Sequence, residues 1–284
     1  MPELPEVETI TRSLNHPGGR VFNDSGSLST YPGVVGRTIR NCVVQWERTI
    51  AAPDVQSFCS QLAGQCIREV NRRGKFILFT LSDGFLICHL RMSGDIRVEA
   101  DLPETIQKHD RVLLQFEDGL RLVFNDPRKF GRFWLVDDPQ KVLSALGPDP
   151  FSDELTPARM HEMLQNRKRT IKPLLMDQSF LAGLGNIYTD EALHLARIHP
   201  LQRSDRLTLE QAGRLLDSIR EVLMEGIRRN GASIDWVYRG GEFQNYFKVY
   251  QRTGKPCYTC GSPIVRIVNG QRGTHFCPNC QKKL

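Results

Sequence analysis

The first residues of the chain, MPELPEVE, carry a group that can act as a nucleophile. Proline is small, so removal of the initiating Met would leave Pro2 with a free secondary amine. A terminal α-amine titrates at about pH 8, about two units below a lysine side chain, and its neutral form can attack a carbonyl carbon. Many chains also begin with Met-Pro for processing reasons, and Pro5 suits the first turn of a helix. The start of the chain alone leaves a catalytic Pro2 and an ordinary helix start both open.

Four of the eight cysteines have the spacing of a zinc site. They form two CxxC pairs separated by sixteen residues: Cys257 with Cys260, and Cys277 with Cys280. This spacing matches the template for a zinc ion held by four thiolates. Four cysteines leave no open coordination position, which indicates a structural zinc rather than a catalytic one. Disulfides are the alternative, and an intracellular chain disfavours them.

The segment between the two pairs, PIVRIVNGQRGTHF, has two strand-like runs around NGQRG. This pattern predicts a hairpin with Gln271 and Arg272 at its tip. A guanidinium on a rigid tip suits bidentate phosphate recognition, although a solvated turn arginine fits the same pattern.

Composition limits the class of protein. The chain has 284 residues, 40% hydrophobic and 25% charged, which favours two domains over one. No apolar run reaches the roughly 18 residues of a membrane span, and the acidic N-terminus lacks the apolar stretch of a secretory signal. We therefore expect a soluble intracellular protein. The net charge of +6 comes from residues 251–284, which hold six basic residues and no acidic one, so an anionic polymer is the expected partner.

The elements that must position these groups change type along the chain. Residues 5–14 predict a short helix, and residues 15–33, rich in Gly, Pro, Ser and Asn, predict a long loop. From 34 to 137, short runs of β-branched and aromatic residues alternate with SDG, EDG and DPRKFG. This pattern favours an antiparallel β-sandwich or barrel.

Beyond a linker that contains LGPDPFSD, the apolar period becomes helical. Thr156 is expected to cap a helix that holds Pro157 in its first turn. Further helical runs are TIKPLLMDQ, GNIYTDEALHLARI and LTLEQAGRLLDSIREVLMEGIRRNG, the last closed by Gly231 as a C-cap. Residues 232–250 are aromatic and contain glycines, and we expect a mobile loop there.

Six motifs together resemble the formamidopyrimidine-DNA glycosylase family. They are PELPEVE at the start, RRGKF at 72–76, HLRMSG at 89–94, NDPRKFG at 125–131, GLGNIYTDEAL at 183–193 and the four-Cys finger. They occur in the family's order and span almost the whole chain.

The resemblance implies an α+β fold: an N-terminal antiparallel β-sandwich with an N-terminal helix, and a C-terminal helical domain with a helix-two-turn-helix motif and a four-Cys zinc finger. On this sequence it places a catalytic sandwich domain at 1–137, a linker at 138–153, the helical domain at 154–231, a lesion-recognition loop at 232–250 and the finger at 251–284.

The resemblance further implies a base-excision DNA repair enzyme. Such an enzyme excises oxidised purines, 8-oxoguanine and formamidopyrimidines among them, from duplex DNA and then cleaves the strand by β,δ-elimination. Damaged double-stranded DNA is the implied partner, with one structural Zn²⁺, no organic cofactor, no membrane and a monomeric protein.

The family's catalytic roles fall on four residues of this chain. By resemblance, Pro2 attacks C1′ of the damaged nucleotide and displaces the base, and the resulting iminium acidifies the neighbouring sugar protons. Glu3 stands beside the nucleophile to transfer protons. Lys75 matches the lysine that assists β-elimination, and Arg272 matches the finger arginine assigned to δ-elimination and phosphate binding. Glu6 either orients the terminus or compensates the helix dipole.

A base must leave the helical stack before C1′ can be attacked, and the void must be filled. Met92, Arg128 and Phe130 match the family's void-filling residues. A Met adapts its shape, a Phe can wedge between base steps and an Arg can hydrogen-bond the orphaned base. Positions that match contacts to phosphates or the lesion strand are His109, Arg169, Lys172 and Asn186. Three further histidines match no such site: His161, His194 and His199.

Three departures from the family pattern stand out. The 15–33 loop is longer than expected, Arg91 stands where a small residue usually precedes the Met, and lesion contacts cannot be transferred individually onto 232–250. Two rival functions remain at this point. One is an endonuclease VIII-like glycosylase for oxidised pyrimidines, a group that typically has Gly where this chain has Leu4. The other is a non-catalytic zinc-finger DNA-binding protein.

Overall fold

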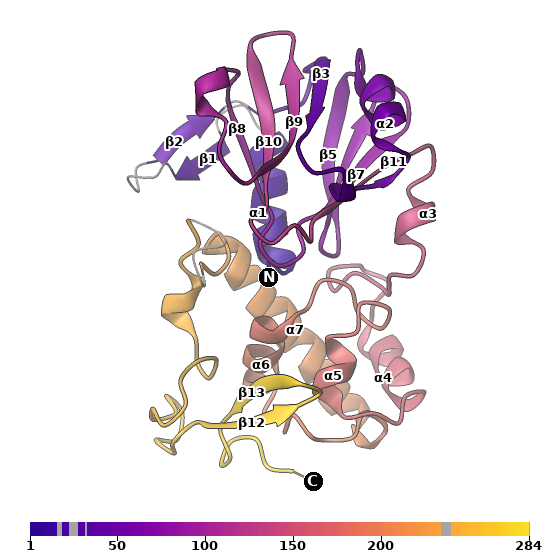
Figure 1. Ribbon diagram of the computed structural model, residues 1–284. Coiled ribbons are helices and arrows are strands. Elements are labelled where there is room, and N and C mark those ends of the chain that lie inside the picture. The colour runs from indigo at the N-terminus through magenta and orange to yellow at the C-terminus, as the bar shows by residue number, and fades with distance from the viewer. Residues whose placement is uncertain (16–18, 23–27, 32, 234–239, 284) are drawn as a thin grey trace. The chain divides into compact units, whose positions relative to one another are not determined.

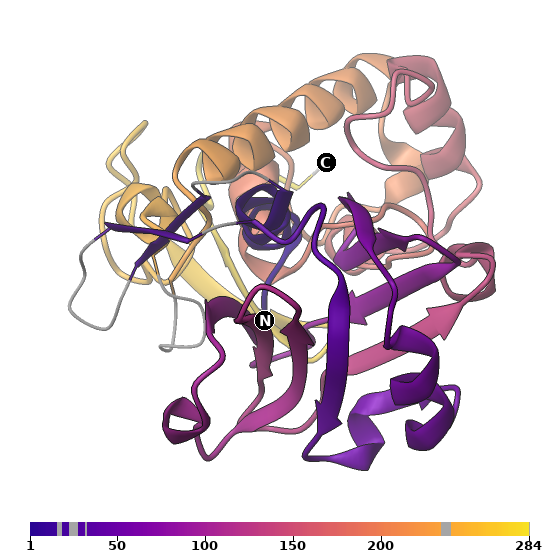
Figure 2. The ribbon, with the colours of Figure 1, turned by 90° about the horizontal axis from the view of Figure 1, so that it is seen from above.

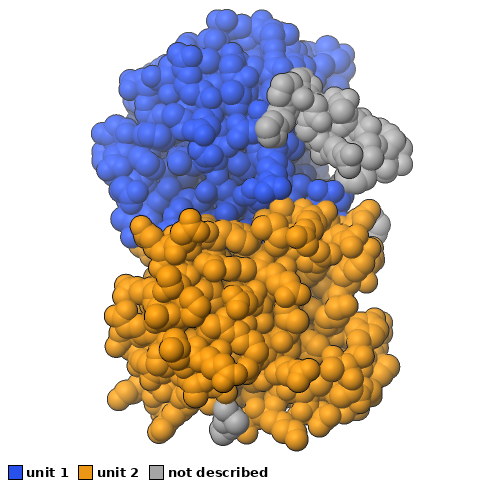
Figure 3. All heavy atoms as spheres, turned by 180° about the vertical axis from the view of Figure 1, so that it is seen from behind, with its two compact units in different colours: residues 1–144, 230–241 blue, residues 145–229, 242–284 orange. Residues whose placement is uncertain are grey.

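The computed structural model describes residues 1–15, 19–22, 28–31, 33–233 and 240–283, and they fall into two compact units. Unit 1 comprises Met1–Ser144 and Asn230–Gly241, and unit 2 comprises Ala145–Arg229 and Glu242–Leu284 (Figure 3). In the described part of the chain, no helix combines the length and the apolar character that a membrane span needs.

Unit 1 is built on two sheets (Figures 1 and 2). The four-stranded sheet has the order β3 (Ile39–Val44), β9 (Asp110–Phe116), β10 (Leu120–Asn125), β8 (Asp95–Ala100). The five-stranded sheet has the order β4 (Ile50–Ala52), β11 (Arg132–Val136), β7 (Phe85–His89), β6 (Phe76–Leu81), β5 (Ile67–Arg73). Pairing is antiparallel except between β11 and β4. Buried residues of both sheets form one core, so the predicted sandwich is confirmed.

Helix α1 (Leu4–Asn15) closes this core along the edge strand β5. Its buried Val7, Ile10 and Leu14 recur at helical spacing and join the core of the sandwich. At its C-terminal end, the Asn15 amide donates to the carbonyl of Val70 at 2.7 Å and accepts from the Val70 N–H at 3.3 Å. The edge of β5 is therefore satisfied by a side chain, and the start of α1 is held on the sandwich.

Several elements of unit 1 differ from the sequence-based expectation. The segment expected to be a loop, 15–33, contains two antiparallel strands, β1 (Gly19–Phe22) and β2 (Leu28–Tyr31), while 16–18, 23–27 and 32 lie outside the described residues. Strands β4 and β5 and helix α2 (Val55–Leu62) were not predicted, and α3 (Gln140–Leu143) lies in the expected linker. The N-cap of α2 is Asp54, which accepts from the Ser57 N–H at 3.0 Å.

Unit 2 packs its helices around α6 (Asn186–Leu195), which is buried from Ile187 to His194. The surrounding helices are α4 (Pro157–Gln165), α5 (Ile171–Leu175) and α7 (Leu209–Arg228). The predicted cap Thr156 is confirmed, since its side chain accepts from the Arg159 N–H. The predicted C-cap at Gly231 is wrong: α7 has Arg229 as its C-cap, and Asn230 and Gly231 both follow with positive φ.

The segment expected to be a mobile loop is partly ordered. Residues 234–239 lie outside the described residues, whereas Phe243–Tyr246 form a 3₁₀ turn whose Phe243 ring stacks on Tyr188. The buried Glu191 accepts hydrogen bonds from the N–H groups of Lys248, Val249 and Tyr250. The buried carboxylate therefore connects residues 248–250 to α6, and the mobility of the loop stays a prediction. The chain ends in the hairpin of β12 (Val265–Asn269) and β13 (Arg272–Phe276).

Candidate active site and nucleic-acid interface

Pro2 and Glu3 are buried at the start of α1, and one carboxylate fixes them there. Glu6 accepts a hydrogen bond from the Glu3 N–H at 2.7 Å and another from the Ala232 N–H at 2.7 Å. Gly231 leaves room for this contact, since a Cβ on it would lie 2.7 Å from the Glu6 side chain. Of the two roles left open for Glu6, the geometry favours orienting the terminus.

Lys75 lies at the tip of the β5–β6 hairpin, where Gly74 has the positive φ that short hairpin loops need. Lys75 is only 4% exposed, and lysines are rarely buried to this extent. Arg72 connects this tip to α1: it donates to Glu8 at 2.8 Å and to the Gly74 carbonyl at 3.2 Å. The fold thus ties the helix that carries Pro2 to the turn that carries Lys75.

His89 is a candidate active-site residue that the sequence motifs did not single out. It pairs with Phe76 across β6 and β7, and its ring lies edge-on to Phe76 with centroids 4.6 Å apart. Burial lowers the pKa of His89 to about 3, with further lowering by the positive charges of Arg91 and Lys75. A neutral imidazole therefore lies in the surroundings of Lys75. Its place in HLRMSG, at the end of the strand adjacent to RRGKF, was the available signal.

The three predicted void-filling residues occupy two loops of unit 1. Met92 follows β7 and is half-buried, whereas Arg128 and Phe130 follow β10 and are exposed. The Arg128 guanidinium lies 5.2 Å from the centroid of the Phe130 ring. These two side chains are presented to solvent, so core packing does not explain them.

His109 lies beside this second loop. Its backbone carbonyl accepts from the Asp126 N–H at 2.9 Å, and its Nδ1 is 3.1 Å from Nη2 of Arg111. The Arg111 Nε donates to the Asp126 carbonyl at 2.9 Å. One hydrogen-bond network therefore holds His109 and the start of the loop after β10 that carries Arg128.

Asn186 lies at the first turn of α6, which has no side-chain cap. Gln178 shapes the preceding loop by accepting from the Gly183 N–H and donating to the Leu184 carbonyl. The Asn186 Oδ1 atom is buried and has no hydrogen-bond partner among the described residues. A polar amide at the positive end of a helix is a suitable place for a phosphate.

Lys172 is enclosed rather than presented to solvent. It is fully buried, with Nζ 2.7 Å from Asp190 Oδ1 and 2.9 Å from the Gly273 carbonyl. Asp190 also accepts from the His275 N–H at 2.9 Å, so it connects α5, α6 and β13. A DNA contact by Lys172 would require its ammonium to leave Asp190, and this assignment stays a prediction.

Arg169 and Arg272 differ in their surroundings. Arg169 forms a half-exposed ion pair with Asp177 at 2.7 Å. Arg272 is exposed at the first position of β13, directly after the turn formed by Gly270 and Gln271, both with positive φ. The predicted hairpin is confirmed, but its turn consists of Gly270 and Gln271, and Arg272, predicted at the tip, pairs with Asn269 as the first residue of β13. Pro173 of α5 supports the turn, 3.2 Å from where a Cβ of Gly270 would lie.

The four cysteines converge at one point: their sulfur atoms all lie within 4.8 Å of one another. Cys260 and Cys277 are 3.4 Å apart, and Cys257 and Cys280 are 4.0 Å apart. Tetrahedral coordination with Zn–S bonds of about 2.3 Å places sulfurs about 3.8 Å apart, so the residues fit a structural zinc ion. Nε2 of His194, expected to be solvated or in the core, is 3.6 Å from the Cys257 sulfur.

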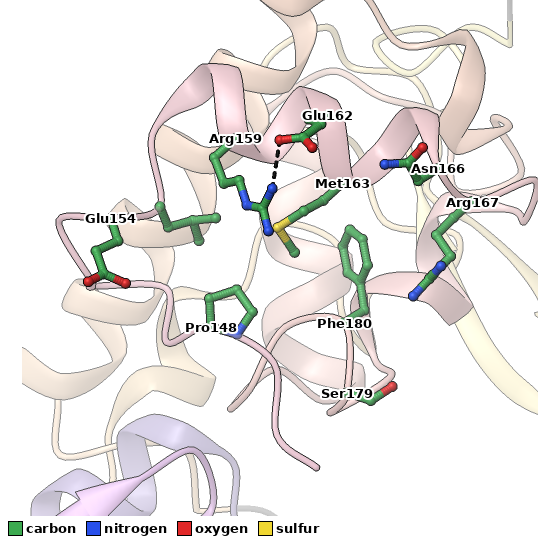
Figure 4. A pocket seen from close by; sticks show the side chains of 10 residues that line it. Pro148, Glu154, Arg159, Glu162, Met163, Asn166, Arg167, Ser179 and Phe180 are labelled. Carbon is green, nitrogen blue, oxygen red and sulfur yellow. Dashed lines mark hydrogen bonds and ion pairs between the residues drawn. The ribbon is translucent and has the colours of Figure 1, made fainter. Parts of the chain in front are cut away.

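A cavity of unit 2 lies elsewhere. It measures about 440 Å³ and is lined by α4 and the loops around Pro148 and Phe180 (Figure 4). Arg159 and Glu162 form an ion pair of 2.6 Å at its wall. None of the predicted site residues lines it, so the candidate site is not this cavity.

Three family models match the chain in succession. They are the formamidopyrimidine-DNA glycosylase N-terminal domain at residues 1–133, the formamidopyrimidine-DNA glycosylase H2TH domain at 146–237, and the zinc finger found in FPG and IleRS at 254–283. The formamidopyrimidine-DNA glycosylase of Enterococcus faecalis is 43% identical, covering 99% of this chain and 98% of the relative. That of Protochlamydia amoebophila is 40% identical over the full length of both.

Solved structures show the same similarity. One is MutM in complex with DNA that contains carbocyclic 8-oxo-G, 37% identical, with a TM-score of 0.86 over 99% of this chain and 100% of that one. Another is Lactococcus lactis Fpg in complex with DNA that contains an abasic site, 36% identical, with a TM-score of 0.86 and the same coverage.

Proposed function

The chain belongs to the formamidopyrimidine-DNA glycosylase family, and from this premise we propose how its residues divide the work. The protein is a base-excision repair enzyme for oxidised purines in DNA, a glycosylase that also cleaves at abasic sites. The observation that carries the residue assignment is the Glu6 carboxylate, which fixes the start of α1 through the N–H groups of Glu3 and Ala232.

Pro2 is the nucleophile. Loss of the half-exposed Met1 frees its amine. The nitrogen forms a bond to C1′ of the damaged nucleotide while the bond from C1′ to the base breaks and the base leaves with a proton. The first product is an aminal. The C1′–O4′ bond then breaks as the nitrogen lone pair forms the C=N bond and O4′ takes up a proton, which leaves an iminium ion whose positive charge lowers the pKa of the sugar protons next to it. Glu3 adjoins the reacting nitrogen and transfers protons to the leaving base and the opened sugar.

Two cations assist the elimination steps. Loss of a proton beside the iminium expels the 3′ phosphate, and a second elimination expels the 5′ phosphate. Lys75, at the turn connected to α1 through Arg72, assists the first step. Arg272, exposed on the finger hairpin, binds phosphate and assists the second.

The remaining residues hold the opened duplex. Met92, Arg128 and Phe130 fill the void left by the extruded nucleotide. His109, Arg169, Lys172 and Asn186 bind the DNA backbone, and the place of Asn186 in the first turn of α6 supports its share of this role. The chain acts as a monomer inside the cell, where its DNA substrate is found.

The test compares Glu3→Gln with Glu47→Gln, a matched change at an exposed glutamate. Two duplexes are used. One carries 8-oxoguanine opposite cytosine, and the other carries an oxidised pyrimidine instead of 8-oxoguanine. We expect the native protein and Glu47→Gln to release 8-oxoguanine faster than the pyrimidine, and Glu3→Gln to bind the duplex without releasing the base. Faster release of the pyrimidine, or full activity of Glu3→Gln, would contradict the proposal.

A further inference from the structure

Asp126 is a buried acid that lies between the two loops of the void-filling residues. Its side chain is fully buried, at the end of β10, two residues before Arg128. One carboxylate oxygen accepts from the hydroxyl of Ser93 and from the Arg128 N–H at 3.1 Å. The other accepts from the Gly131 N–H at 2.7 Å. The Met92 loop contributes Ser93, and the Arg128 loop contributes the two N–H groups.

Ser93 completes the connection between the loops. Its hydroxyl oxygen accepts from the Arg128 N–H at 3.2 Å while it donates to Asp126. Ser93 follows Met92 directly in the chain. Its side chain therefore connects the loop of Met92 both to the Asp126 carboxylate and to the backbone of Arg128.

The two loops also approach one aromatic ring. A Cβ on Gly94 would lie 2.7 Å from the Phe124 ring, and a Cβ on Gly131 would lie 2.2 Å from it. Each loop therefore places a glycine against Phe124: Gly94 directly follows Ser93, and Gly131 itself donates to the Asp126 carboxylate. Packing of this kind has few alternative arrangements, so the separation of the loops is set by Phe124 below and by Asp126 between them.

We propose that Asp126 is a positioning residue for base excision: it holds Met92 in register with Arg128 and Phe130 so that the three side chains enter the duplex together. This inference rests on the void-filling role proposed above for those three residues. The backbone strain at Lys129, with φ of 62°, agrees with it, since a fixed loop can hold an unfavourable conformation.

The inference separates two activities of one enzyme. Excision of 8-oxoguanine requires a stacked base to leave the duplex, and void filling replaces the lost stacking. Cleavage at a preformed abasic site has no base to unstack, so it depends less on the three side chains. A loosened pair of loops should therefore slow excision more than abasic-site cleavage.

The experiment measures both single-turnover rates in the same preparation, with the active fraction counted by borohydride trapping on abasic DNA. Asp126→Asn keeps the side-chain shape but turns an N–H donor toward the donors of Ser93, Arg128 or Gly131. We expect the ratio of excision to abasic-site cleavage to fall about ten-fold or more, the effect of opposing a buried hydrogen bond. Asp137→Asn changes an exposed acid that forms an ion pair with Lys141; it is the matched control and should leave the ratio unchanged.

Two further variants keep the outcomes distinct. Ser93→Ala removes the hydrogen bonds of the Ser93 hydroxyl without turning two donors toward each other, so it should lower the ratio of excision to abasic-site cleavage less than Asp126→Asn. If Asp126→Asn does not fold, Ser93→Ala tests the positioning role in its place. Phe130→Ala tests the premise. If Phe130→Ala lowers the ratio but Asp126→Asn and Ser93→Ala do not, the positioning role is wrong and the proposed function stands. If Phe130→Ala leaves the ratio unchanged, the void-filling premise fails and the inference fails with it.

Discussion

At the scale of residues, a single carboxylate, that of Glu6, positions the nucleophile Pro2. Glu6 accepts from two N–H groups that are far apart in sequence, those of Glu3 and Ala232. The helix motif PELPEVE explains why an acid suits this turn, but the partner at Ala232 follows only from the fold. The position of Pro2 therefore depends on a chain segment more than 200 residues away.

Arg91 gives a prediction about backbone strain. It has φ of 57°, and its N–H donates to His89 Nδ1 at 2.9 Å. This conformation costs a non-glycine residue about 1 kcal/mol, so glycine is the residue that suits the position. Arg91→Gly should raise the free energy of unfolding by about that amount, whereas Arg91→Ala keeps the strain and should not. Denaturant unfolding distinguishes them, and equal stabilities of the two variants would refute the strain.

His89 gives a prediction about pH. Its folded pKa of about 3 lies below the ordinary value of 6.5, so the unfolded chain binds a proton that the folded chain refuses. Protonation of His89 therefore does not lower the unfolding free energy above pH 6.5, and it lowers this free energy progressively as the pH falls toward 3. Between pH 7 and 5 the loss from this group should be roughly 2 kcal/mol. His89→Gln should have a flatter dependence of unfolding free energy on pH over that range, and an unchanged slope would contradict the assignment.

At the scale of elements, one buried ion pair docks the finger hairpin on the helices. Asp190 of α6 binds Lys172 of α5 and the His275 N–H of β13. Asp190→Asn removes the negative charge that Asp190 provides beside the buried Lys172 ammonium, and we expect a loss of about 3–5 kcal/mol of unfolding free energy. Asp177→Asn removes the same kind of partner from the half-exposed Arg169 and should cost less than about 1 kcal/mol. Similar losses measured by denaturant titration would show that the buried pair is not special.

Much of the element pattern was predictable because it is local. The run FILFTL alternates in burial along β6, and Thr156 with Pro157 marks the start of α4. Strand β5, IREVNRR, was missed because its burial does not alternate: among its residues only Ile67 and Val70 are buried, three positions apart. Strands β1 and β2 were missed because the segment that contains them is rich in Gly, Pro, Ser and Asn.

The site could be predicted from the sequence only where its residues belong to short motifs of recognisable chemistry. The sequence identified Pro2, Lys75 and the four-Cys finger as candidates. It did not identify Asp126, because its significance arises from Ser93, a residue 33 positions away, and it did not foresee that Lys172 is enclosed by Asp190. Contacts of this kind depend on tertiary packing, which residue types and spacing do not encode locally.

At the scale of the whole molecule, the zinc ion stabilises the part of the chain with the smallest core. The cluster around the cysteines contains only a few buried residues among the described ones, Val249 and Ile264 besides cysteines. Removal of the metal should therefore unfold the β12–β13 hairpin, displace Arg272 and weaken DNA binding, while the sandwich core stays folded.

Titration with a thiol-binding mercurial in the presence of a colorimetric chelator should release one zinc per chain. Circular dichroism and a DNA-binding assay on the same sample then follow the finger. Full DNA affinity after zinc release would show that the finger does not depend on the metal.

The most direct measurement of the central claim is borohydride trapping on a duplex with 8-oxoguanine opposite cytosine, followed by peptide mass analysis of the adduct. The account predicts that the covalent bond lies at Pro2 of a chain that has lost Met1. An adduct at Lys75 or another lysine, or strand cleavage by a protein that keeps Met1, would contradict it.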